Sequence, residues 1–285
     1  MKKIKSVISL LLAFSFITAP LSLLQACTDN SAKDLVPEHS VQLPTDNEIQ
    51  TDTENIEQPT PTPEPEPEPE LPSVSYATYI KCTGNGVNIR SGAGTSYSAL
   101  GVAEKNTSYA VVGQSGNWYK TYYRGKTAYI YATYTAVFEM EESENEQIED
   151  VIKQGYKLIG VPYVYGAVRF HDGKGKLLAG FSAQKFDCSS LIQYIFYQGA
   201  GKILDVNTRT QVKQGKFVKR KDLQRGDCIF FTNESRQHLT GVERVGHVAL
   251  YLGDNYILHT ASDYARIEKM TASRWNFYIE ARRFI

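Results

Sequence analysis

The chain has 285 residues and no formal net charge, and 42% of its residues are hydrophobic and 12% aromatic. This length suggests about two domains, and the composition excludes a chain that is disordered throughout. The charge is segregated, because residues 28–72 hold 12 acidic residues and one basic residue, whereas residues 151–285 hold 21 basic and 11 acidic ones. That basic excess suits a partner that carries carboxylates or phosphates.

The N-terminus has the pattern of an export signal. Three lysines within the first five residues precede an apolar stretch over residues 7–19, which is too short to span a bilayer comfortably. The sequence LQAC at 24–27 resembles the lipobox at which bacterial lipoproteins are cleaved and acylated. We therefore expect a lipoprotein signal peptide over residues 1–26, lipid attachment at Cys27 and a location at the bacterial cell envelope. An ordinary signal peptide with an incidental cysteine is the alternative.

Residues 27–73 are predicted to form a tether. They carry the acidic excess and a Pro-Thr and Pro-Glu alternation from Pro59 to Glu70, which favours an extended, solvated chain. No later stretch has the length and apolarity of a membrane span, so we expect membrane contact through the lipid alone. Export argues against a nucleic-acid partner, as does the lack of interleaved aromatic and basic residues.

Short alternating apolar segments over residues 76–137 predict a small all-β barrel. Gly-rich turns separate the segments, which lie at 87–89, 109–112, 118–123 and 128–131. The sequence closely resembles bacterial SH3-like domains at VNIRSGAGT (87–95), GQSGNWYK (113–120) and GKTAYI (125–130). The resemblance implies a module that binds the cell wall. Aromatic residues such as Trp118 are expected to belong to its core.

A second domain is expected over residues 148–285. An apolar stripe that begins at Ile148 and an acidic segment before it predict an amphipathic helix, which GVP at 160–162 ends. Cys188 is predicted to open another helix, with Asp187 as its N-cap. A thiol there faces the positive end of the helix dipole, which lowers its pKa and favours the thiolate. Most cysteines at such positions are only structural, so a catalytic role needs a base.

Two histidines fall on one predicted hairpin, with a turn at residues 253–255. If Leu252 opposes Tyr256 across that turn, His247 and His259 lie on the same face two residues apart, where their rings can meet.

That arrangement supplies a base for the thiol. His247 would take the proton of Cys188, while His259 would bond the other ring nitrogen of His247 and hold its tautomer. A zinc site is the alternative for one cysteine and two histidines, but no motif supplies a fourth ligand.

Four separated motifs follow one another in order: GVPYVYG (160–166), FDCSSL (186–191), GDCIFF (226–231) and GHVALYLG (246–253). They resemble the NlpC family of papain-like cell-wall cysteine peptidases. The resemblance implies an α+β papain-like catalytic domain behind the small all-β SH3-like barrel. It also implies cleavage of the bond between γ-D-glutamate and a diamino acid, meso-diaminopimelate or lysine, in murein stem peptides through a Cys188 thioester. No metal or other cofactor is implied.

The same resemblance implies further site residues. The backbone N–H of Cys188 and the hydroxyl of Tyr165 would stabilise the oxyanion. Asp187 and Ser189 would bind the amino end of the stem peptide, although Asp187 could instead serve only as a helix cap. The expected partners are stem peptides or murein fragments, bound by a monomer.

Several alternatives stay open at this point. The domain could be a catalytically silent scaffold that binds the cell wall, or an N-acetylmuramoyl-L-alanine amidase or acyltransferase, because thiol and histidine sites recur in acyl transfer. Cys82 and Cys228 are interpreted as structural thiols, with a disulfide between them as the alternative.

Overall fold

The structure is a computed structural model that describes residues 74–285. The predicted signal peptide over residues 1–26, the lipid site at Cys27 and the tether up to residue 73 lie outside the described residues. Within the described part, no helix is long and apolar enough to cross a membrane.

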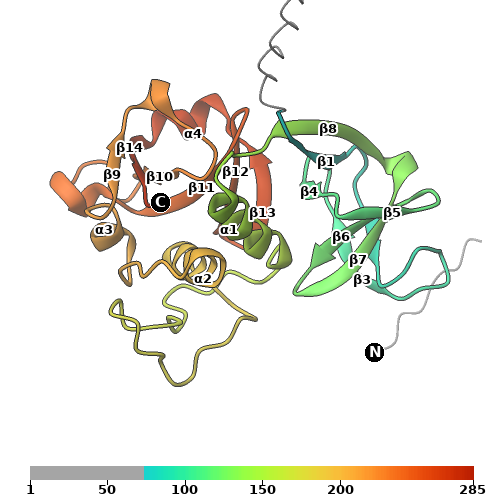
Figure 1. Cartoon of the computed structure of the whole chain (residues 1–285), viewed down its shortest axis with the longest axis horizontal. Helices are drawn as coiled ribbons and strands as arrows, with labels where there is room; N and C mark the ends of the chain where they lie inside the picture. Colours follow the sequence, from blue (N-terminus) through green and yellow to red (C-terminus); the bar gives the residue numbers. More distant parts are fainter. Residues whose placement is uncertain (1–73) are drawn as a thin grey trace, which may run out of the picture. The chain divides into compact units, whose positions relative to one another are not determined.

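The described chain begins with a run of strands and continues with a mixed α and β region (Figure 1). The first region comprises β1 (Tyr76–Cys82), β2 (Val87–Arg90), β3 (Ala99–Ala103), β4 (Ser108–Ala110), β5 (Gly113–Ser115), β6 (Trp118–Tyr123), β7 (Lys126–Tyr131) and β8 (Thr135–Glu141). The second region comprises α1 (Glu146–Lys157), α2 (Cys188–Ala200), α3 (Thr208–Gln211), β9 (Lys216–Val218), β10 (Cys228–Phe231), β11 (His247–Gly253), β12 (Tyr256–Ala261), β13 (Tyr264–Lys269), α4 (Ala272–Asn276) and β14 (Tyr278–Arg283).

The strands form two sheets. One has five strands in the order β3-β2-β7-β6-β5, and the other has nine in the order β8-β1-β4-β13-β12-β11-β10-β14-β9. The all-β character of the first region is confirmed. However, three of its strands continue into the sheet of the second region, where a single pair, Ser108 and Ile267, joins β4 to β13. No pattern in the sequence indicated this shared sheet.

The two predicted helices are confirmed as α1 and α2. The side chain of Asn145 caps α1, and Asp187 caps α2 through a capping box with Ser190. The helices pack closely, since a Cβ atom on Gly199 would lie 2.4 Å from the backbone nitrogen of Val151. Glycine is therefore required at this contact.

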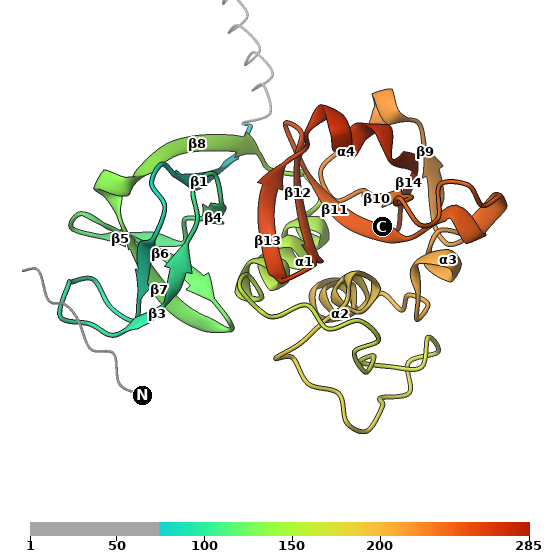
Figure 2. The ribbon, with the colours of Figure 1, turned by 180° about the vertical axis from the view of Figure 1, so that it is seen from behind.

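Helices cover both faces of the strands that carry the predicted histidines (Figure 2). Alternate residues Phe230, Val248 and Leu250 pack in the core that includes α2, whereas their neighbours Phe231 and Ala249 pack with residues from the α4 segment. This period-two alternation gives every residue of β11 a defined side. It places His247 on the face that α4 covers.

Cys82 and Cys228 are free thiols and are fully buried. The interpretation as structural residues is confirmed, and the alternative disulfide is wrong. Burial raises the pKa of Cys82 to about 11 and that of Cys228 well above its ordinary value, so both thiols stay protonated.

A buried arginine connects the two regions. Arg225 donates both ends of its guanidinium to the carboxylate of Glu149 on α1, at 2.6 and 2.9 Å. It also donates to the hydroxyls of Tyr79 on β1 and Tyr156 on α1, each at 3.0 Å, and to the carbonyl of Leu252 at 2.8 Å. These five bonds satisfy all five N–H groups of the side chain.

Removing this cation is expected to destabilise the whole protein. Arg225→Ala leaves the buried Glu149 carboxylate without its partner, which costs about 3–5 kcal/mol of the free energy of unfolding. Denaturant unfolding measures the loss. Arg282→Ala is the matched control, because its pair with Glu280 is more exposed and is worth less than about 1 kcal/mol. Equal losses in the two variants would contradict the importance of Arg225.

Candidate active site

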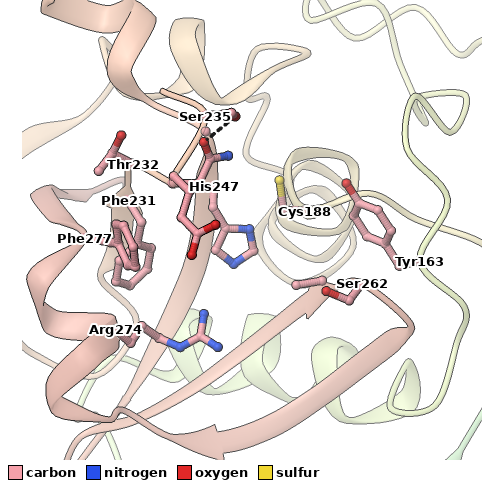
Figure 3. A pocket seen from close by; sticks show the side chains of 13 residues that line it. Tyr163, Cys188, Phe231, Thr232, Ser235, His247, Ser262, Arg274 and Phe277 are labelled. Atoms are coloured by element: carbon pink, nitrogen blue, oxygen red, sulfur yellow. Dashed lines mark hydrogen bonds between the residues drawn. The ribbon is translucent and has the colours of Figure 1, made fainter. Parts of the chain in front are cut away.

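Cys188 and His247 line one cleft of about 780 Å³. Figure 3 shows the sulfur of Cys188 and the ring of His247 on facing sides of it, with Tyr163 beside the cysteine and Arg274 on the side of the histidine. Within residues 74–285, no three His, Cys, Asp or Glu side chains are grouped as metal ligands. The cleft thus brings together a thiol, which can act as a nucleophile, and an imidazole, which can act as a base.

Cys188 is the first residue of α2, as predicted, but its thiol is not ionised there. Burial raises its pKa to about 12, and the charge of Asp187 adds to the increase. The backbone of Val248 and Ser189 lowers this pKa by a smaller amount, as does the charge of Arg169. The predicted low pKa is therefore wrong for the ligand-free protein, because the loss of solvation outweighs the helix N-terminus.

The two imidazoles meet as the sequence predicted. Nε2 of His247 lies 2.9 Å from Nδ1 of His259, which is a hydrogen-bond distance. Nδ1 is therefore the nitrogen of His247 that is left for the thiol.

The turn of this hairpin differs by one residue from the prediction. Gly253, not Leu252, opposes Tyr256, and the turn has two residues, Asp254 and Asn255, with φ of 48° and 63°. Positive φ at both positions is the geometry of a type I′ turn. Leu252 is the extra residue of a bulge, so the register beyond it is the predicted one, with Leu250 opposite Leu258.

Both histidines are neutral at neutral pH. Burial lowers the pKa of His247 well below its ordinary value, and the positive charge of Arg274 lowers it further. Burial also lowers the pKa of His259, although the carboxylate of Glu268 partly opposes this effect. A neutral imidazole can accept the thiol proton.

Glu268 and Arg274 complete this group, and the sequence analysis missed both. Nε2 of His259 lies 3.1 Å from Oε1 of Glu268, and Arg274 donates to the same oxygen. The register of β13, in which Arg266 opposes His259, explains the contact of Glu268. Glu268 is two residues further along the same face and is thus the diagonal neighbour of His259.

The structure does not support the role predicted for Tyr165. Its side chain is 86% exposed and does not line the cleft. Tyr163 lines the cleft together with Cys188 instead. Burial raises the pKa of Tyr163 to about 12, and the nearby charge of Asp187 adds to the increase, so its hydroxyl keeps its proton. The chain turns at Tyr165 and Gly166, where Gly166 has φ of 72°.

Asp187 and Ser189 do not line the cleft and are almost completely buried. Asp187 accepts the backbone N–H of Ser190 and the hydroxyl of Ser189 with one oxygen. Its other oxygen pairs with Arg169 at 2.8 Å and accepts the N–H of Gly166 at 3.2 Å. Its carboxylate is saturated within the protein, so the capping role is supported and the expected binding of an amino end is not.

Arg169 lies in the segment 167–185, between the GVPYVYG and FDCSSL motifs. Besides Asp187, it donates to the hydroxyl of Ser189 at 3.2 Å. Its cation thereby offsets the carboxylate that stands next to the thiol.

Comparison with known proteins agrees with these observations. Residues 160–283 match the NlpC/P60 family, and residues 85–136 match the bacterial SH3 domain. The chain is 34% identical over 113 residues to the peptidoglycan endopeptidase RipA of Mycolicibacterium smegmatis, which covers 40% of this chain and 21% of that protein. It is 31% identical over 123 residues to a gamma-D-glutamyl-L-lysine dipeptidyl-peptidase of Bacillus subtilis, covering 43% and 35%.

Among solved structures, an NlpC/P60 family protein from Bacillus cereus matches with a TM-score of 0.38 and 22% identity, over 73% of this chain and 63% of that one. The chain spans about a fifth to a third of the two curated relatives named above. Its family matches nevertheless cover both described regions. The chain therefore contains a bacterial SH3 domain followed by an NlpC/P60 domain with a papain-like α+β fold.

Proposed function

We propose that this protein is a cysteine endopeptidase of peptidoglycan that cleaves the bond between γ-D-glutamate and a diamino acid in murein stem peptides. The observation that carries the proposal is the pairing of Cys188 with a neutral His247 in one cleft of an NlpC/P60 domain. The bond is suggested by the relative in Bacillus subtilis named as a gamma-D-glutamyl-L-lysine dipeptidyl-peptidase. Cys188, His247 and His259 are the proposed catalytic group.

The reaction begins from a neutral thiol and a neutral imidazole. The sulfur of Cys188 attacks the γ-carbonyl carbon of D-glutamate while Nδ1 of His247 takes the thiol proton. His247 then gives this proton to the departing amine of the diamino acid, and the C–N bond breaks to leave a thioester on Cys188. Water, deprotonated by His247, attacks the thioester carbonyl and releases the acid and the thiol.

Two donors are proposed for the oxyanion that forms in each step. One is the backbone N–H of Cys188 at the start of α2, and the other is the hydroxyl of Tyr163. Tyr163 suits this task because its raised pKa keeps the proton on the oxygen that must donate it. Tyr163 therefore replaces Tyr165 in the proposed site.

The rest of the chain supports action at the cell wall. The basic excess of residues 151–285 suits an anionic wall, and the SH3 domain is a candidate for holding it there. We assign residues 76–137 to that domain and residues 148–285 to the peptidase. Attachment through a lipid at Cys27, with the tether of residues 27–73 behind it, is part of the same proposal.

Product analysis tests the cleavage. The purified protein is incubated with muropeptides and free stem peptides, and mass spectrometry identifies the bond that is cut. Cys188→Ala is expected to abolish scission, and His247→Ala to lower kcat/KM by about 10²–10⁴-fold through loss of the base. Cys82→Ala, which changes a buried thiol outside the cleft, is expected to retain activity.

Scission between muramic acid and L-alanine would show an amidase instead. Binding to peptidoglycan without any scission would show a silent scaffold, and either result would contradict the proposed function.

The protonation state of Cys188 has its own test. With a thiol pKa of about 12, the reactive thiolate is a small fraction at neutral pH and grows as the pH rises. The rate of Cys188 alkylation by iodoacetamide is therefore expected to rise about tenfold per pH unit between pH 7 and 10. Mass spectrometry locates the modified residue. A rate that levels off below pH 8 would indicate a preformed thiolate and imidazolium pair.

A further inference from the structure

We propose that Glu268 is a positioning residue of the active site, whose carboxylate determines which ring nitrogens of His259 and His247 carry protons. The inference rests on the proposed function for its kinetic test but not for its structural one. The observations behind it are two consecutive hydrogen bonds, from Glu268 to His259 and from His259 to His247.

The first bond fixes the proton of His259. An ionised carboxylate only accepts hydrogen bonds, so Nε2 of His259 must be the donor to Oε1 of Glu268. Glu268 is ionised throughout the working range: burial raises its pKa, but the bond to His259 and the charge of Arg274 outweigh this and lower it to about 2. In the neutral ring of His259, Nδ1 then has no proton.

The second bond passes this choice to His247. A bare Nδ1 on His259 can only accept, so the proton between the rings belongs to Nε2 of His247. The neutral ring of His247 then has a bare Nδ1. That nitrogen is the one left for the proton of Cys188.

The opposite arrangement would be inactive. If His259 carried its proton on Nδ1, it would donate to Nε2 of His247, and the neutral His247 would hold its own proton on Nδ1. His247 could then no longer accept the thiol proton. One carboxylate outside the cleft therefore selects the competent one of two tautomer pairs.

Titratable and charged groups from several elements face this pair. Glu268 and Arg266 come from β13, Arg274 from α4 and Cys188 from α2, while the loop residue Glu234 lines the cleft. The negative charge of Glu268 favours protonation of His259, and the positive charge of Arg274 opposes protonation of both histidines. Substitution of these two residues should therefore shift the pH dependence of the rate in opposite directions.

The direct test is the tautomer state of the histidines. Ring ¹⁵N chemical shifts of the purified protein are expected to show protons on Nε2 of both His247 and His259. In Glu268→Gln, whose amide can either accept or donate, a mixture of tautomers is expected. Protons on Nδ1 of both rings in the wild type, or unchanged ring shifts in Glu268→Gln, would overturn the proposal.

Kinetics supplies the second test. Glu268→Gln is expected to lower kcat by about 10–100-fold with KM changed less than about twofold, since the residue does not line the cleft. Activity falls on the acid side as His247 becomes protonated. This limb of the pH profile is expected to move to lower pH in Glu268→Gln and to higher pH in Arg274→Gln.

The matched control is Glu280→Gln, which removes a similarly exposed carboxylate that pairs with Arg282 on β14. It is expected to leave both the rate and the pH profile unchanged. If the acid limb stays in place in Glu268→Gln and Arg274→Gln, or moves in the same direction in both, the pair of Glu268 and Arg274 has only a structural role. If the wild type cleaves no stem peptide, the proposed function fails, and the ring shifts still decide the role of Glu268.

Discussion

The arrangement of the candidate active site depends on the buried guanidinium of Arg225. A buried cation is tolerated only when all its donors are satisfied, and this one needs α1, β1 and the end of β11 in place at once. Its bond to the carbonyl of Leu252 is the most consequential, because Leu252 is the bulge residue of the hairpin. The bulge compensates for the one-residue shift of the turn, so the register between β11 and β12 beyond it is kept. In that register His247 and His259 lie within hydrogen-bond distance.

The strand order converts this register into chemistry. His247, His259 and Glu268 come from β11, β12 and β13, which are consecutive in the chain and adjacent in the sheet. A line of polar side chains can therefore run across the strands, with each residue bonded to its neighbour. Cys188 meets this line from α2, so the proposed nucleophile and its proposed base are held by different elements whose relative position the shared core fixes.

Much of the candidate site could be predicted from the sequence, because those parts depend on local rules. The helix cap at Asp187 and the alternation around His247 follow from short-range patterns. The role of Glu268 could not be predicted, because no motif fixes the register of β13. Tyr163 was missed in favour of Tyr165 because the segment is not a strand, and its turn decides which ring faces the thiol. The pKa of Cys188 was predicted to be lowered, whereas it is raised, because the depth of burial is a property of the packed structure.

A protonated thiol has a further consequence for the durability of the protein. Peroxides react with thiolates, and the oxidation of cysteine beyond sulfenic acid is irreversible in most proteins. Burial keeps the thiol of Cys188 protonated and therefore in the unreactive form. The same burial that opposes ionisation therefore also protects this thiol from oxidative damage, and the sequence places no second cysteine next to Cys188 that could restore it through a disulfide.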